Sequence, residues 1–201
     1  MPLYTVFGVN GVGKDSVIRE AQQAEPDIMV ISETKLLMFG LGIIGAFDSS
    51  VTPGREHYLA LETTSQSEIQ QVEDYFIDIL EPVADSPVRT VMTSHLIPAQ
   101  LLNNSPNYLI KPKPACLHTV GRALINITAN PSDVFARRNA DERDRGNLEV
   151  QDIAEHMGLC GQEWQRLQAE AATQGSSAEF FTIDNSNLLK ASEQMLTLIR
   201  I

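Results

Sequence analysis

The sequence has few cysteines, comparatively few basic residues and no long hydrophobic run. Its two cysteines, Cys116 and Cys160, lie far apart in 201 residues, which argues against a disulfide framework and indicates a reducing compartment. The 26 acidic residues outnumber the 15 basic ones, and the resulting net charge of −11 argues against a broad nucleic-acid-binding face. The most apolar stretch, Leu36 to Phe47, is too short to span a membrane, and the N-terminal apolar run is too short for a signal peptide. We therefore expect a cytoplasmic protein without nucleic-acid or membrane partners. The sequence leads to no prediction of its oligomeric state.

Short apolar runs alternate with segments of helical periodicity along the chain. Five runs are predicted to be strands: Leu3–Phe7, Ile28–Ile31, Val88–Met92, Ala123–Thr128 and Phe180–Ile183. Continuous apolar runs of this kind are typical of a parallel sheet that is covered on both faces. The sequence therefore predicts one α/β domain over residues 1–201, with a five-stranded, mostly parallel, doubly wound sheet that binds ligands at the carboxyl ends of its strands.

Two longer segments show helical spacing. Apolar residues recur every three or four positions from Tyr58 to Val83, which predicts a long helix that Pro82 would end. The same spacing runs from Leu148 to Ala172, where we expect Gly158 and Gly161 to divide the segment into two helices.

The stretch from Gly8 to Lys14 fits G-x-x-x-x-G-K, the loop that wraps the phosphates of a nucleoside triphosphate. A strand precedes it and a helix follows it, which is the arrangement that the mechanism needs. The glycines let successive N–H groups point at one anion, the lysine reaches the terminal phosphates, and the helix adds its positive dipole end. We expect the nucleotide-binding residues of this stretch to be Gly8, Val9, Asn10, Gly11, Val12, Gly13, Lys14, Asp15 and Ser16.

Thr93, Ser94 and His95 follow the third predicted strand. In most phosphate-loop enzymes an Asp at this kind of strand end helps to hold Mg²⁺ through water. Here the hydroxyl of Thr93, together with that of Ser16, is the candidate for the metal. His95 is a candidate contact for a substrate phosphate, and a packed or hydrogen-bonded structural histidine is the alternative.

Four arginines gather within nine residues after the fourth strand: Arg137, Arg138, Arg143 and Arg145. Phosphoryl transfer needs cations around the transferring oxygens, although the interleaved acids also fit a surface ion-pair network. Together with the glycine loop they favour a small Arg-rich lid over residues 137–148. The loop after the last strand contains Asn185, which either borders the nucleobase or is an ordinary turn residue.

These parts, in this order, resemble small phosphate-loop nucleotide kinases, and archaeal-type adenylate kinases in particular. Residues 8–13 are similar to the G-V-P-G-V-G loop of that family, with Asn10 in place of Pro. Thr93-Ser94-His95 looks like its D-T-H, with the Asp lost. The arginines of 137–145 look like its R-R…R-x-R lid segment. Lys14-Asp15-Ser16 is closer to the nucleotide-kinase pattern than to that of switch GTPases, which have Ser or Thr directly after the lysine.

The resemblance implies an enzyme that phosphorylates a nucleoside monophosphate, AMP-like, with ATP and Mg²⁺. It implies catalytic roles for Lys14, Arg138, Arg143 and Arg145, a nucleotide contact for Arg137, and an acceptor contact for Arg55. Thr93 in place of Asp weakens the expected Mg²⁺ site unless Glu33, Asp15 or Asp184 supplies the charge. The alternatives are an ATP-binding regulatory protein, a kinase acting on a non-nucleotide small molecule, and an ATPase acting on a macromolecular partner.

Overall fold

The computed structural model describes residues 3–46, 53–96, 99–100, 107–108, 120–140 and 148–200. Five strands form one sheet: β1 (Leu3–Phe7), β2 (Met29–Ser32), β3 (Thr90–Thr93), β6 (Ala123–Thr128) and β7 (Glu179–Asp184). Two short strands form a separate antiparallel pair: β4 (Ala99–Gln100) and β5 (Asn107–Tyr108). The helices are α1 (Lys14–Ala24), α2 (Glu33–Gly40), α3 (Arg55–Thr63), α4 (Gln66–Asp74), α5 (Phe76–Asp85), α7 (Pro131–Asn139), α8 (Val150–Thr173) and α9 (Leu188–Arg200).

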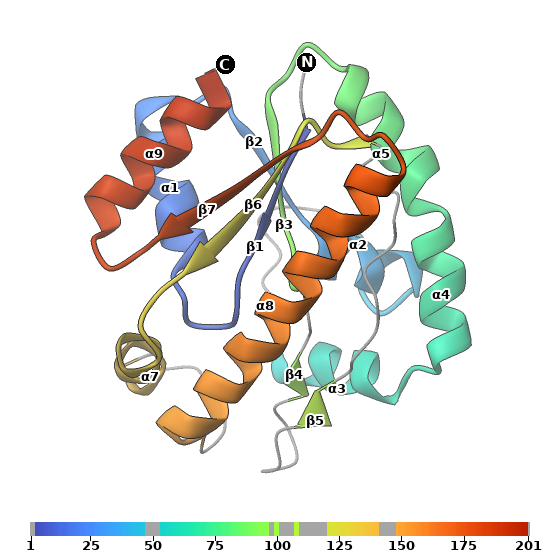
Figure 1. Cartoon of the computed structure of the whole chain (residues 1–201). Coiled ribbons are helices and arrows are strands. Elements are labelled where there is room, and N and C mark those ends of the chain that lie inside the picture. The colour runs from blue at the N-terminus through green and yellow to red at the C-terminus, as the bar shows by residue number, and fades with distance from the viewer. Residues whose placement is uncertain are drawn as a thin grey trace.

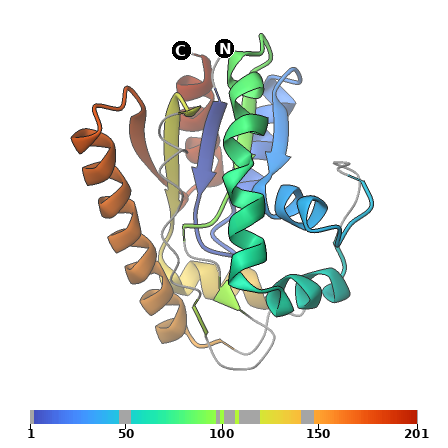
Figure 2. The ribbon, with the colours of Figure 1, turned by 90° about the vertical axis from the view of Figure 1, so that its right-hand side faces the viewer.

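All neighbouring strands of the main sheet are parallel, in the order β2-β3-β1-β6-β7. The central strand β1 is buried along its whole length, as a strand covered on both faces must be. Helices α1 and α9 pack together on one face, and α8 crosses the opposite face (Figure 1). Figure 2 shows α8 and α1 on either side of the sheet. The predicted α/β fold with a parallel five-stranded sheet is confirmed.

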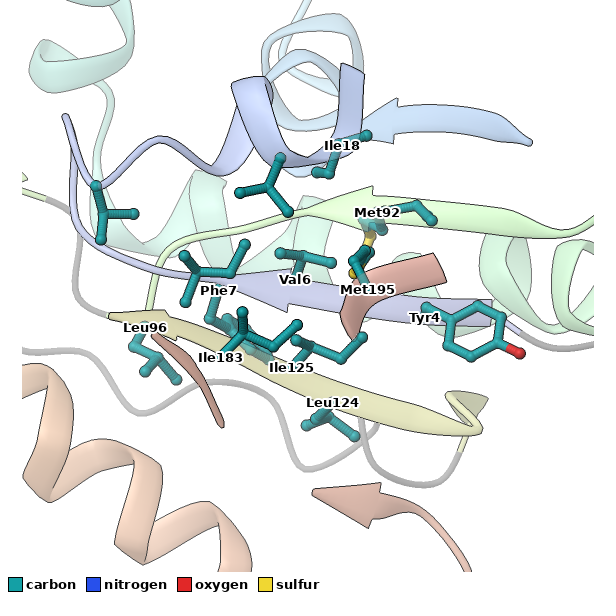
Figure 3. Close-up of a cluster of buried hydrophobic side chains, with 14 of the residues drawn as sticks. Tyr4, Val6, Phe7, Ile18, Met92, Leu96, Leu124, Ile125, Ile183 and Met195 are labelled. Carbon is teal, nitrogen blue, oxygen red and sulfur yellow. The ribbon is translucent and has the colours of Figure 1, made fainter. Parts of the chain in front are cut away.

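The hydrophobic core lies between the sheet and these two helical layers. Side chains of β1, β3, β6 and β7 meet those of α1 and α9 in one cluster (Figure 3). Tyr4 adds a polar tie, because its hydroxyl donates a hydrogen bond of 3.1 Å to the carbonyl of Ile199. Thr5 is fully buried in β1, and its hydroxyl finds no hydrogen-bond partner among the described residues.

The segment from Tyr58 to Val83 differs from the single helix that its periodicity predicts. It forms α3, α4 and α5. The division between α3 and α4 lies at Ser65, which starts a new helix with a capping box: its hydroxyl accepts from the N–H of Glu68, whose carboxylate accepts from the N–H of Ser65. Pro82 does not end the helix but lies inside α5. The carbonyl that Pro82 leaves without an intrahelical donor is that of Asp78, on an exposed residue where water can bond it.

The expected division of the 148–172 segment is also wrong. α8 is one helix of 24 residues that passes through Gly158 and Gly161. Each of these glycines weakens a helix by only about 1 kcal/mol. The opposite stripe of α8, which includes Trp164 and Leu167, is buried against the sheet and more than offsets that loss. No described helix combines the length and the apolar character that crossing a membrane requires.

Candidate functional site

The phosphate loop joins β1 to α1 at the carboxyl edge of the sheet. Gly11 and Gly13 have positive φ angles of 85° and 93°, which favour glycine. A Cβ on Gly11 would lie 2.5 Å from Cγ of Arg138, and one on Gly13 would lie 2.5 Å from Nδ2 of Asn185. Both glycines are therefore required by conformation and by space. Gly13 is also the N-cap of α1, so the loop ends at the positive end of that helix dipole.

Lys14 is the first residue of α1 and is only 7% exposed. Its Nζ donates a hydrogen bond of 2.6 Å to the carbonyl of Gly8, at the beginning of the loop. The same Nζ lies 3.5 Å from Nδ1 of His95. The ammonium is thus held across the loop, between its first glycine and the end of β3.

The end of β3 connects the phosphate loop with the start of α2. The N–H of Ser94 donates to the carbonyl of Val6 (2.9 Å), which continues the pairing of β3 with β1 by one residue. The hydroxyl of Ser94 donates to Oε2 of Glu33 (2.5 Å). On the next residue, Nδ1 of His95 lies 3.2 Å from the carbonyl of Gly8.

Glu33 is the carboxylate that lies beside the β3 end. It is the first residue of α2, it is 6% exposed, and it is bonded to Ser94 as described above. The other two acids that could replace the missing Asp, Asp15 and Asp184, are both exposed. The hydroxyl of Thr93 donates to the carbonyl of Ile31 (3.4 Å) in the neighbouring strand. The predicted metal roles of Thr93 and Ser16 stay predictions.

Arg137 and Asn185 donate hydrogen bonds to the backbone of the phosphate loop. The guanidinium of Arg137 donates to the carbonyl of Val12 (2.9 Å) and to that of Asn185 (2.7 Å). Nδ2 of Asn185 donates to the same carbonyl of Val12 (2.8 Å). Because a carbonyl can only accept, this contact fixes the orientation of the Asn185 amide. The structure thus brings two predicted nucleotide-binding residues to the loop, as donors to its backbone.

Arg138 is buried, at 6% exposure, with its side chain against Gly11. The other predicted lid arginines, Arg143 and Arg145, lie outside the described residues. Arg55 is the first residue of α3, and its side chain is not among those that the structure describes. Among the residues that the structure describes, no group of three or more His, Cys, Asp or Glu side chains is arranged to hold a metal ion.

Sequence reasoning named Glu33 only as one of three possible sources of charge, and it did not foresee the bond between Glu33 and Ser94. The signal was present, because each residue stands two positions after the end of a predicted strand. What the sequence did not state is that β2 and β3 are neighbours, which places the two residues side by side.

Comparison with known proteins gives a fold and no family. No family model matches the chain, and no curated protein matches it. Among solved structures, the shikimate kinase from Acinetobacter baumannii in complex with shikimate is similar over 100% of this chain and 93% of its own, with a TM-score of 0.60 and 12% identity. The shikimate kinase from Bacteroides thetaiotaomicron has a TM-score of 0.58 and 9% identity, with 100% of this chain and 99% of that chain covered.

A sugar kinase from a Janibacter species is similar as well, with a TM-score of 0.56, 13% identity, and 100% of this chain and 95% of its own covered. These similarities extend over nearly the full length of each protein. At such low identities they show the fold alone. The chain therefore has the same fold as these kinases.

Proposed function

We propose that the chain is an ATP- and Mg²⁺-dependent phosphotransferase whose acceptor is a nucleoside monophosphate, AMP-like. The observation that carries the proposal is the phosphate loop with Lys14 already held across it at 2.6 Å from the Gly8 carbonyl. The positive φ angles of Gly11 and Gly13 support it, because such a backbone can turn successive N–H groups toward one anion.

The donor nucleotide is held mainly by the backbone in this proposal. The N–H groups of residues 8–13 and the N-terminus of α1 bind the phosphates, and Lys14 neutralises charge on the terminal two. Arg138 lies directly against the loop at Gly11, within reach of the same region. Arg143 and Arg145 complete the set of cations that stabilises charge on the transferring oxygens. Positioning and charge stabilisation, rather than covalent chemistry, account for most of the rate.

The oxygen donors near the loop fit Mg²⁺, which prefers carboxylate, hydroxyl and water ligands. Ser16 lies in the first turn of α1, and the buried carboxylate of Glu33 supplies the charge that Thr93 lacks. When bound, the ion neutralises charge on the phosphates. We propose that Ser16 and Thr93 would contribute oxygens to the ion and that Glu33, held by Ser94, would supply the negative charge beside it.

The acceptor side gives a reason to test a second candidate. A nucleoside monophosphate carries a phosphate that needs cations, and Arg55 is our candidate for that contact. The chain has no Lys or Arg between Glu56 and Val88, whereas acids are frequent there. An acceptor bound against this segment would meet little positive charge, so an uncharged compound such as a small polyol would suit it better. A kinase for a non-nucleotide small molecule is therefore the second proposal.

ADP formation from ATP and Mg²⁺ tests both proposals when it is measured against a panel of nucleoside monophosphates and a panel of small hydroxyl compounds. Lys14→Ala is expected to abolish turnover while leaving the fold intact. Lys190→Ala, a change at an exposed lysine of α9, is the matched control and should retain full turnover.

The dependence of ADP formation on the added compound identifies the acceptor or contradicts the proposal. Turnover that depends on a monophosphate supports the first candidate, and turnover that depends on an uncharged hydroxyl compound supports the second. ATP binding without any turnover would favour a regulatory protein, and phosphate release that needs a macromolecule would favour an ATPase. Equal turnover in wild type and Lys14→Ala would contradict the assignment of the site. Small molecules as the only partners, and a cytoplasmic location, stay predictions.

A further inference from the structure

We propose that His95 is a positioning residue for the ATP side of the site: it anchors the Gly8 carbonyl that holds Lys14. The inference rests on the proposed function, because it matters only if Lys14 binds phosphate. It moves His95 from the acceptor, where the sequence placed it, to the phosphate loop.

Three atoms form a small triangle at the mouth of the loop. Nζ of Lys14 is 2.6 Å from the Gly8 oxygen, Nδ1 of His95 is 3.2 Å from that oxygen, and the two nitrogens are 3.5 Å apart. The ammonium has only donors, and the carbonyl has only lone pairs. The imidazole is the one member that can act either way, so its tautomer decides which contact is made.

The distances favour a proton on Nδ1 that is donated to Gly8. A distance of 3.2 Å is at the upper end of the normal range for an N–H···O bond, whereas 3.5 Å between the nitrogens lies beyond that range. An unprotonated Nδ1 would also set its lone pair against the carbonyl oxygen. The carbonyl then accepts two bonds, one from Lys14 and one from His95, which its two lone pairs allow.

A second donor on this carbonyl has a consequence for Lys14. Glycine itself restricts the backbone little, so the orientation of the peptide that follows Gly8 depends on its contacts, and Lys14 would follow the oxygen if it turned. The bond from His95 attaches this peptide to the end of β3. Lys14 can then keep its bond to Gly8 and direct its two other N–H groups at phosphate, without a search for that arrangement when ATP arrives.

The position of His95 is itself fixed by its neighbour. Ser94 is bonded through its backbone to Val6 in β1 and through its hydroxyl to Glu33 in α2. The backbone at the β3 end is therefore held on two sides, and the imidazole extends from a rigid point. A substitution at His95 should thus change the loop without releasing β3.

The test compares substitutions that keep or lose a donor at the position of Nδ1. His95→Asn places an amide nitrogen the same number of bonds from Cα as Nδ1. His95→Gln extends one bond further, and His95→Leu has no donor. ATP affinity with Mg²⁺, measured by calorimetry, should stay within about threefold of wild type for Asn and fall about tenfold for Gln and Leu, the size expected for one lost hydrogen bond.

A Lys14→Ala background tests whether the effect passes through the lysine. His95→Leu should weaken ATP binding there by less than about threefold, because little preorganisation of Lys14 remains to be lost. Tripolyphosphate, titrated in the same way, should show the same pattern, since the effect concerns phosphate and not the base. A loss of the same size with or without Lys14 would overturn the inference, as would no loss in His95→Leu or no rescue by His95→Asn.

The ¹⁵N chemical shifts of His95 in the wild-type protein give a readout that needs no variant to fold. We expect Nδ1 to carry the proton in the free protein, and a proton on Nε2 alone would overturn the inference. Failure of the proposed function is a separate result, in which wild type binds neither ATP nor tripolyphosphate while the imidazole still shows a protonated Nδ1.

Discussion

Gly13→Ala should destabilise the phosphate loop far more than a methyl group would suggest. Gly13 has a φ of 93°, and a residue with a Cβ pays about 1–2 kcal/mol in this region. The new Cβ would lie 2.5 Å from Nδ2 of Asn185, which must then move and lose its bond to the Val12 carbonyl, at about 1 kcal/mol. The free energy of unfolding should therefore fall by about 2–3 kcal/mol.

Urea unfolding followed by circular dichroism measures this difference, and Gly158→Ala provides the control. Gly158 is exposed within α8, and a Cβ there meets nothing within 4 Å. The same substitution should raise the free energy of unfolding by about 0.5–1 kcal/mol, because alanine is the better helix former. A Gly13→Ala protein within about 0.5 kcal/mol of wild type would refute the close packing of the loop against Asn185.

Two further predictions concern stability away from the loop. Thr5→Val keeps the shape of the side chain and removes a buried hydroxyl that has no hydrogen-bond partner among the described residues. The free energy of unfolding should therefore rise by about 1 kcal/mol. An unchanged or lower value in urea unfolding would show that the hydroxyl is hydrogen-bonded. Hydrogen bonds from Arg200 and Arg89 lower the pKa of Glu25, and one from Arg89 lowers the pKa of Asp27. Their contribution to stability is therefore present above the ordinary carboxyl pKa of about 4 and is lost as the pH falls below it. Arg89→Met should flatten this acid limb in melting experiments, and an identical limb in both proteins would contradict the assignment.

Strands buried on both faces could be predicted closely from the sequence. β1 and β6 have the predicted bounds, because every residue of such a strand is apolar or small enough to be buried. β7 extends to Glu179 and Asp184. The backbones of these two residues pair in the sheet, but their side chains are exposed and lie outside the apolar run. A burial signal cannot mark residues that pair through their backbone while their side chains face water.

Helix boundaries were harder to predict from the sequence because local signals compete. The spacing of apolar residues from Tyr58 onwards continues across a capping box at Ser65, and the cap determines where α4 begins. In α8 the competition goes the other way: Gly158 and Gly161 are poor helix formers, and packing of the opposite stripe overrides them.

At the site, the glycine loop and Lys14 could be placed from sequence because they are contiguous. The contacts between distant segments could not. Arg137 donates a hydrogen bond to the carbonyl of Val12, and Ser94 donates one to Glu33, only because the strands assemble in the order β2-β3-β1-β6-β7. Parallel neighbours need long crossover connections, so sequence proximity says little about which strand ends meet.

The central claim is that this site transfers the terminal phosphoryl group of ATP. Its most direct test is to incubate the protein with Mg²⁺, AMP and ATP labelled in the γ-phosphate, and to separate the products. The account predicts label in ADP, with none transferred by Lys14→Ala. If no label leaves ATP with AMP, with any other monophosphate or with any small hydroxyl acceptor, the claim is contradicted, whether or not ATP binds.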